Sequence, residues 1–132
     1  MSKNYPNNAC IVCHTSFPHR HAKKAVNLYC SKKCEGENKR RNTFERFQAG
    51  EVRERNTIRK ILKDIKHECW SCGLKEWRGH RLSLEIDHIN GDAGNNMPSN
   101  LRLVCPNCHS ITSTWKGRNR HKGRASRGLP TN

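Results

Sequence analysis

The most regular hydrophobic pattern in the chain lies between residues 55 and 66. Four apolar residues recur there at i, i+3, i+4, i+7 spacing: Ile58, Ile61, Leu62 and Ile65. This spacing places them on one face of a helix, with charged residues on the opposite face. Phe44 and Phe47 mark a weaker helical pattern that ends before Gly50. Residues 35–66 are therefore predicted to form a helical connector whose apolar side chains face a core.

Further along the chain, the pattern changes to the two-residue alternation that is typical of strands. The stretches LEID at 84–87 and LRLVC at 101–105 both alternate, and each predicts a half-buried strand. The segment between them begins with Asn-Gly and is rich in Gly, Asn and Pro, which predicts a loop. Pro106 suits the first position of a helix, on which Ile111 and Trp115 would share one face. The predicted order is strand, loop, strand, helix, with that face packed on the hairpin.

Few residues are available to build a hydrophobic core. The chain has 132 residues, of which 33% are hydrophobic and 6% aromatic. Apolar burial alone rarely offsets the folding entropy of so small and polar a chain, so the eight cysteines are candidates for further cross-links. The chain does not open on an apolar run, and no run approaches the ~20 residues of a membrane span. We therefore expect an intracellular protein with no membrane partner, in which metal sites are favoured over disulfides.

The cysteines fall into two groups of four. The first group is Cys10, Cys13, Cys30 and Cys34, and the second group is Cys69, Cys72, Cys105 and Cys108. A two-residue spacer lets both sulfurs of one turn face a single ion, and zinc prefers four tetrahedral thiolate or imidazole ligands. Each group is therefore predicted to hold a structural zinc ion. In the first group His14, His19 or His21 could take the place of one thiolate.

The first group resembles small treble-clef-like zinc fingers. It has the turn CIVCH, an aromatic residue and then YCSKKC, where Ser31 would cap a short helix. The resemblance implies nucleic-acid binding or simple stabilisation of a terminus. Lys23, Lys24, Lys32 and Lys33 favour contact with DNA. The alternative is a stabilising module with a solvated surface.

Charge is unevenly distributed around a formal net charge of +15. Residues 1–34 carry six Lys/Arg and no acid, residues 35–66 carry ten and six, residues 67–115 carry four and five, and residues 116–132 carry six and none. A basic excess of this size in a small chain favours a polyanion partner, most often nucleic acid. The near-neutral segment keeps its carboxylates, as a metal-dependent nuclease requires. Purely electrostatic binding gives no reason for this distribution.

Asp87 and His88 place a carboxylate beside an imidazole at the end of the first predicted strand. Alone, the pair indicates no more than a polar strand end. Together with Asn100 and His109 it makes up the run DHINGD…NN…NLRLVCPNCHS. This run resembles the His-Asn-His (HNH) nucleases, which have a ββα-metal core, and the resemblance covers residues 67–119.

The resemblance implies a role for each of these residues. His88 would be the general base that takes a proton from the attacking water. Asp87, directed toward the helix, and His109 would bind one divalent cation that stabilises charge on the phosphate and the leaving oxygen. Asn100 would hydrogen-bond the loop and hold the base in orientation. The implied products carry a 5′-phosphate and a 3′-hydroxyl.

One position departs from some members of that family. Ser113 stands where those members have a further metal-binding histidine, four residues past His109. A zinc-type catalytic site with three histidines is therefore not expected. A carboxylate with an imidazole favours Mg²⁺ or Mn²⁺, with Ni²⁺ as a further candidate. The expected cofactors are two structural Zn²⁺ ions and this one catalytic divalent cation.

The end of the sequence is strongly basic. Its candidates for contact with the DNA backbone are Lys116, Arg118, Arg120, Lys122 and Arg124. Such an arm would make DNA binding depend steeply on salt, whereas the alternative is a solvated chain end. The three tryptophans are expected to pack around the zinc sites: Trp70, Trp77 and Trp115.

These observations predict a small, zinc-stapled α+β chain in which a ββα-metal HNH core is inserted between two zinc knuckles. The expected organisation is a zinc finger at 1–34, a helical connector at 35–66, the nuclease core at 67–117 and a basic tail at 118–132. The predicted function is a phage or homing-type endonuclease of the bacterial cytoplasm, monomeric or dimeric on double-stranded DNA, that nicks one strand or cuts both. The alternative is a non-catalytic zinc-finger DNA-binding protein, a regulator or packaging accessory, on the same scaffold.

Overall fold

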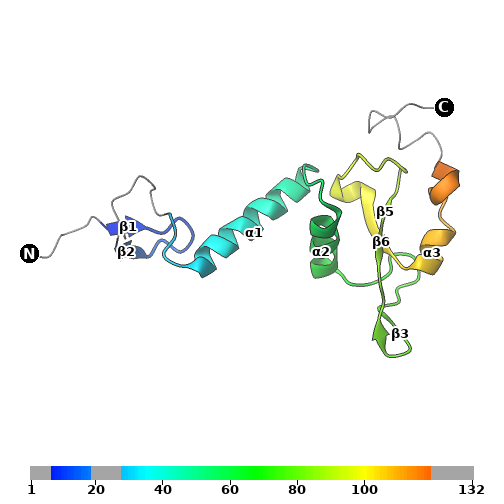
Figure 1. Cartoon of the computed structure of the whole chain (residues 1–132), viewed down its shortest axis with the longest axis horizontal. Coiled ribbons are helices and arrows are strands. Elements are labelled where there is room, and N and C mark those ends of the chain that lie inside the picture. Colours follow the sequence, from blue (N-terminus) through cyan, green and yellow to red (C-terminus); the bar gives the residue numbers. More distant parts are fainter. Residues whose placement is uncertain (1–6, 19–27, 120–132) are drawn as a thin grey trace, which may run out of the picture. The chain divides into compact units, whose positions relative to one another are not determined.

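The computed structural model describes residues 7–18 and 28–119 (Figure 1). The chain divides into two compact units, residues 1–43 and 44–132, and each is described by itself. Helices and short strands are both present, so the expected small α+β composition is confirmed. No helix in the described ranges is both long and apolar enough to cross a bilayer.

The first unit contains a short hairpin followed by a helix. Its elements are β1 (Asn7–Ala9), which pairs antiparallel with β2 (Ser16–Pro18), and α1 (Lys32–Gln48), whose last residues belong to the second unit. The backbone N–H of Cys34 donates to the Ser31 hydroxyl over 3.3 Å, so the predicted helix cap is confirmed. The helix is 17 residues long rather than short, because the sequence from 35 to 48 contains no proline and a single β-branched residue.

In the second unit, helix α2 (Arg55–Ile65) brings the predicted apolar face to the core. Ile58 is buried, and Ile61 and Leu62 pack against the same core. The prediction is wrong for Ile65, which is 62% exposed. It is the last residue of the helix, one turn beyond the residues that reach the core.

The central hairpin of the second unit lies where the alternating pattern predicts it. Strand β5 (Glu85–His88) pairs antiparallel with β6 (Leu101–Val104). Ile86 is buried in the core that α2 also lines. Because successive side chains of a strand point to opposite faces, Glu85 and Asp87 lie on the other face. The hairpin therefore separates an apolar face from a face that carries two carboxylates.

Helix α3 (Pro106–Ser110) begins at the predicted proline but ends early. The prediction that Ile111 and Trp115 share one face of this helix is therefore wrong. The Thr112 hydroxyl donates to the His109 carbonyl over 2.9 Å, and hydroxyl side chains that bond the backbone in this way compete with helix continuation. Ile111 is 75% exposed, while the ring of Trp115 packs edge-on against His109 with centroids 4.5 Å apart.

A further hairpin is formed by β3 (Glu76–Trp77) and β4 (His80–Arg81), and the hydrophobic pattern does not predict it. Its central residues, Arg78 and Gly79, have positive φ angles of 51° and 77°, as in a type I′ turn. Arg-Gly is not one of the pairs that usually mark such turns. The described residues also form two short 3₁₀ helices, η1 (Pro98–Asn100) and η2 (Lys116–Asn119).

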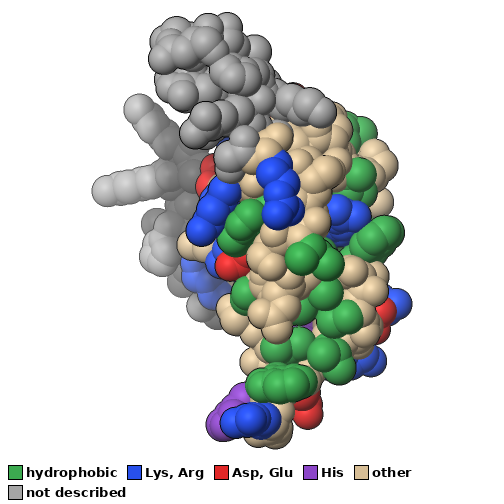
Figure 2. All heavy atoms as spheres, turned by 90° about the vertical axis from the view of Figure 1, so that its right-hand side faces the viewer, with side chains coloured by type: hydrophobic (Ala, Val, Ile, Leu, Met, Phe, Trp, Pro, Cys, Tyr) green, Lys and Arg blue, Asp and Glu red, His purple; other side chains and the backbone are tan. Residues whose placement is uncertain are grey.

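Apolar side chains reach the surface near this hairpin. Trp77 is 60% exposed and Trp70 is 66% exposed, so the expectation that these two tryptophans are packed away around zinc is wrong. The lower end of the face drawn in Figure 2, where the β3–β4 hairpin lies, shows hydrophobic, basic and histidine side chains together at the surface.

Gly50 lies at a position that fits only glycine. Its φ is +72°, and an added Cβ would lie 2.6 Å from the Met97 sulfur and 3.3 Å from the Met97 backbone nitrogen. We expect Gly50→Ala to lower the free energy of unfolding by about 2–4 kcal/mol, from left-handed strain together with overpacking. Gly79→Ala is the control, because Gly79 has φ +77° and nothing lies within 4 Å of an added Cβ. Urea unfolding gives the free energy of unfolding of both variants. If both substitutions lowered it equally, the contact between residue 50 and Met97 would not contribute to the effect.

Candidate active site and metal centres

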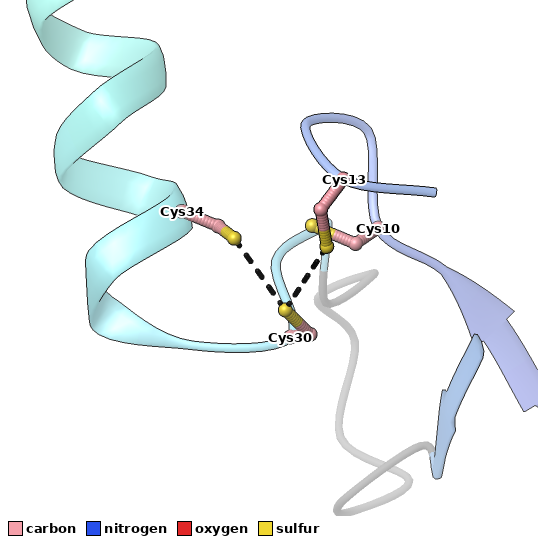
Figure 3. A group of neighbouring side chains, drawn as sticks. All are labelled: Cys10, Cys13, Cys30 and Cys34. Carbon is pink, nitrogen blue, oxygen red and sulfur yellow. Dashed lines mark hydrogen bonds between the residues drawn. The ribbon is translucent and has the colours of Figure 1, made fainter. Parts of the chain in front are cut away.

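The structure brings the four sulfur atoms of each cysteine group close together. The four sulfur atoms of each group lie within 4.8 Å of one another, which suits the roughly 3.8 Å separation of sulfurs that share one tetrahedral zinc ion. In the first group the sulfur of Cys30 lies 3.5 Å from those of Cys13 and Cys34, and the four side chains converge from the β1–β2 turn, the loop before α1 and the first turn of α1 (Figure 3). All eight cysteines lie in the described ranges, and none of them forms a disulfide bond.

The first group reaches four ligands without an imidazole. His14 is exposed and is not part of the group. The other two alternatives, His19 and His21, lie outside the described residues. The arrangement therefore favours a site with four thiolates.

Backbone N–H groups favour the thiolate form in both groups. The N–H groups of Cys13, Cys30 and Val12, in decreasing order of effect, lower the pKa of the Cys10 thiol to about 6. Burial acts to raise the pKa of Cys69, but backbone N–H groups outweigh it and the pKa falls to about 6. Thiolates are the form that binds a metal ion. In each group, therefore, at least one cysteine has a thiol pKa lowered toward the thiolate form that binds a metal ion.

The second cysteine group ties the hairpin to α3. The N–H of Cys105 donates to the sulfur of Cys69 over 3.3 Å, and the sulfur of Cys105 accepts from the N–H of Cys108 at the helix start. Cys69 and Cys105 are also part of the hydrophobic core. A metal ion held here would fix the first turn of α3, and therefore the position of His109, which follows Cys108 directly.

His109 lies between two carboxylates of β5. Its Nδ1 is 2.6 Å from Oε2 of Glu85, and its Nε2 is 3.6 Å from Oδ1 of Asp87. A carboxylate oxygen only accepts, so His109 carries a proton on Nδ1. In the neutral ring this leaves the lone pair on Nε2 facing Asp87. An imidazole held by a carboxylate in this way is the usual arrangement of a metal-binding histidine.

Asp87 is buried, with 3% of its surface exposed. Its Oδ2 accepts from Nε of Arg102 over 2.7 Å, and its Oδ1 accepts from the Thr114 hydroxyl over 2.9 Å. The guanidinium of Arg102 also lies over the ring of Trp70, 4.6 Å from its centroid. The arginine fixes one carboxylate oxygen and leaves the other on the side of His109.

His88 ends β5, and its ring is held by the loop that follows it. Nε2 of His88 lies 3.0 Å from Oδ1 of Asn96. Asn96 is buried and donates from Nδ2 to the backbone carbonyl of Val52 over 3.0 Å. The imidazole is therefore connected through one amide side chain to the backbone between α1 and α2.

The side chain of Asn100 forms hydrogen bonds to the backbone at two places in the same loop, which follows His88. Its Oδ1 accepts from the N–H of Asn90 over 3.0 Å, and its Nδ2 donates to the carbonyl of Asn95 over 2.8 Å. Its own carbonyl accepts from the N–H of Ile89 over 2.9 Å. These three bonds fix the loop against the strand end on which His88 lies, while the bond to the imidazole itself comes from Asn96.

Asp87, His88 and His109 line one small pocket of about 100 Å³, together with Thr114. None of the described residues that line a larger hollow of about 380 Å³, beside Tyr29 and Glu35, is a histidine. Two ligand atoms about 2.1 Å from one ion lie at most roughly 4.2 Å apart, so the 3.6 Å between Asp87 and His109 fits a shared cation. In the described ranges, groups of three or more such ligands occur only as the two cysteine groups.

The basic residues expected to contact DNA are only partly described. Lys23, Lys24, Arg120, Lys122 and Arg124 lie outside the described residues. Lys116 places its ammonium group 4.9 Å from the centroid of the Trp115 ring. Arg118 donates to the carbonyls of Ser110 and Thr112 over 3.1 and 2.9 Å, so its guanidinium holds the segment after α3.

The segment with this geometry matches the family model described as HNH endonuclease over residues 83–110. Over 53 residues the chain is also 47% identical to the H-N-H endonuclease F-TflIV of Escherichia phage T5, a region that makes up 40% of this chain and 23% of the phage protein. The chain thus spans less than a quarter of that relative. The comparison with solved structures found no significant match.

Four residues that contact His88, His109 or Asp87 were not identified from the sequence: Glu85, Asn96, Arg102 and Thr114. Glu85 carried a signal, because it lies two residues before Asp87 and therefore on the same strand face. Arg102 lies opposite Asp87 in the strand register, but the long loop between the two strands keeps that register from being read from the sequence. Asn96 lies in a loop with no periodicity, so nothing in the sequence distinguishes it from the adjacent Asn95.

Proposed function

We propose that the chain is a metal-dependent endonuclease that hydrolyses phosphodiester bonds in double-stranded DNA. The observation that carries this proposal is the convergence of Asp87 and His109, 3.6 Å apart, in one pocket with His88. The HNH match over residues 83–110 supports the same function. The scaffold of this proposal is a ββα-metal core formed by β5, β6 and α3.

Asp87 and His109 are the residues that would hold the catalytic cation. A carboxylate oxygen with one imidazole nitrogen, and water at the remaining positions, suits Mg²⁺, Mn²⁺ or Ni²⁺. When bound, a divalent cation supplies Lewis-acid stabilisation of charge at the phosphate and the leaving 3′ oxygen. Glu85 and Arg102 support this pair, because each fixes the orientation of one of its members.

His88 is the proposed general base. A neutral imidazole can accept a proton from the attacking water near neutral pH. Asn100 keeps the strand end and its loop in place through its three hydrogen bonds. Its proposed role is positioning rather than proton transfer. Attack by water on phosphorus breaks the bond to the 3′ oxygen, which takes a proton from solvent, so the products carry a 5′-phosphate and a 3′-hydroxyl.

The basic charge supports DNA as the substrate. Besides the net charge of +15, a hollow between α2 and β4 is lined mostly by cationic side chains. Its lining residues are Asn56, Arg59, Lys60, Lys63, Asp64 and Arg81. Phosphate contacts of this kind give affinity without sequence specificity. The zinc finger and the basic tail are proposed to add to the same binding.

Cleavage by the wild-type protein tests the proposal. Zinc-replete protein is incubated with several supercoiled plasmids, with and without Mg²⁺, Mn²⁺ or Ni²⁺. Open circles or linear DNA with 5′-phosphate ends are expected only when a divalent cation is added. Binding to DNA without cleavage under every condition would contradict the proposal and favour a non-catalytic DNA-binding protein.

Binding of the catalytic cation can be measured without DNA. We expect His109→Ala to weaken Mn²⁺ binding by at least about tenfold, because even loss of a residue that only orients a ligand commonly costs 10- to 100-fold. Zinc-loaded protein is titrated with Mn²⁺, and free Mn²⁺ is followed by electron paramagnetic resonance. His80→Ala is the matched control, because His80 is exposed on β4. Equal Mn²⁺ affinity in the two variants would show that His109 is not a ligand of the cation.

A further inference from the structure

The break between α1 and α2, residues 49–54, is joined to the loop that follows His88. Three contacts connect the two segments, and all lie in the second unit. The pairs in contact are Gly50 with Met97, Val52 with Asn96, and Arg53 with Gly94. The break lies outside the matched HNH segment at 83–110. The loop that holds the proposed base therefore depends on backbone from another part of the chain.

The central contact of the three fixes the orientation of the Asn96 amide. The Val52 carbonyl is 3.0 Å from Nδ2 of Asn96 and can only accept. The NH₂ group of the amide must therefore face Val52, which leaves Oδ1 facing His88. Both Val52 and Asn96 are buried, at 1% and 6% exposure, so a reversed amide would leave polar groups unpaired away from water.

This orientation determines which nitrogen of His88 carries the proton. Oδ1 of Asn96 is an acceptor and lies 3.0 Å from Nε2 of His88, so Nε2 must carry the hydrogen. In the neutral ring the lone pair is then on Nδ1. His109 has the opposite arrangement, because its Nδ1–H donates a hydrogen bond to the Glu85 carboxylate. The two histidines are held in different tautomers by two different acceptors.

We propose that Asn96 is a positioning residue that holds His88 in its Nε2–H tautomer, so that Nδ1 accepts the proton from water. The α1–α2 break takes part in this through the Val52 carbonyl, which fixes the amide. The role of Nδ1 as proton acceptor rests on the proposed endonuclease function, whereas the tautomer itself does not. Asn96 acts only through His88 and does not contact the reacting atoms.

The tautomer can be observed directly. Protein labelled with ¹⁵N-histidine and loaded with zinc is studied at about pH 8, where a typical imidazole is neutral. Long-range ¹H–¹⁵N spectra show which ring nitrogen carries the hydrogen, and loss of signals in His88→Gln assigns the resonances. Wild-type His88 should be in the Nε2–H form, and Asn96→Ala should convert it to a mixture of both forms.

Kinetics tests the consequence for cleavage. Asn96→Ala should lower kcat by about 10- to 100-fold with little change in KM, as expected for loss of a residue that orients a catalytic group. Asn96→Asp keeps an acceptor for Nε2 but loses the donor to Val52, and should recover part of that loss. Asn42→Ala, which removes an exposed amide on α1, should behave as wild type. Melting temperature and zinc content are matched for every variant.

Each result decides for or against the role of Asn96. A His88 tautomer that is unchanged in folded Asn96→Ala protein would overturn it, and so would an unchanged kcat. Asn96→Asp protein no more active than Asn96→Ala would also overturn it. If the wild type fails to cut any DNA while Asn96→Ala still alters the tautomer, the endonuclease function fails and the positioning of His88 by Asn96 stands.

Discussion

Replacing His88 by alanine should lower the rate of DNA cleavage by about 10²–10⁴-fold, the contribution typical of a general base. DNA affinity should be unchanged, since His88 ends a strand of the near-neutral segment and belongs to neither cysteine group. The initial rate of loss of supercoiled plasmid is measured for wild type and variant at equal zinc content, with Mn²⁺ present. A gel-shift titration gives the affinity of both proteins.

His80→Ala is the matched control for this substitution. His80 is an exposed histidine on β4, so its removal tests whether loss of any imidazole slows the reaction. Its rate should stay within about twofold of wild type. If His88→Ala retains at least a tenth of the wild-type rate, another group accepts the proton and the assignment of His88 is wrong.

Replacing Cys69 by serine should release the metal of the second cysteine group and unfold the second unit. Cys69 is fully buried, and its sulfur accepts from the Cys105 N–H within the core. Structural zinc contributes about 10–16 kcal/mol to folding in isolated zinc fingers near pH 7, far more than a small core can replace. Metal analysis should fall from two zinc ions per chain to one, and cooperative thermal unfolding should be lost.

Cys13→Ser provides the comparison for the other group. Cys13 is exposed and belongs to the first unit, so this variant should also lose one zinc ion but keep a folded second unit. It should still cleave DNA with Mn²⁺, with weaker binding. If Cys69→Ser retained two zinc ions and wild-type unfolding, the second group would not be a structural metal site.

The elements best predicted from the sequence are those with a strong period or spacing. The two-residue alternation located β5 and β6, the helical spacing located α2, and the paired cysteines identified both groups of converging sulfur atoms. The β3–β4 hairpin was not predicted, because two-residue strands joined by Arg-Gly have neither a period nor a usual turn pair. The early end of α3 was not predicted, because the four-residue spacing of Ile111 and Trp115 is that of a helix. The Thr-Ser-Thr segment between these two residues is not helical.

In the candidate site, residues that belong to a local sequence pattern were predicted, and a residue held by a distant contact was not. Asp87, His88, Asn100 and His109 were predicted because they occur in a run with recognisable spacing, and the structure brings Asp87, His88 and His109 into one pocket. Asn96 was not predicted, because its partner Val52 is 44 residues away and no local pattern encodes that pairing. Which nitrogen of His88 takes a proton depends on this distant contact, so the sequence alone does not reveal it.

The most direct test of the proposed active site compares wild type with Asp87→Asn on one supercoiled plasmid with Mn²⁺. The substitution keeps the size of the buried side chain but removes the charge that would hold the cation and that pairs with Arg102. Both proteins should contain the same zinc and bind DNA, and only the wild type should produce open circles. Equal cleavage by both proteins, or binding without cleavage by both, would show that the Asp87–His88–His109 pocket does not hydrolyse DNA.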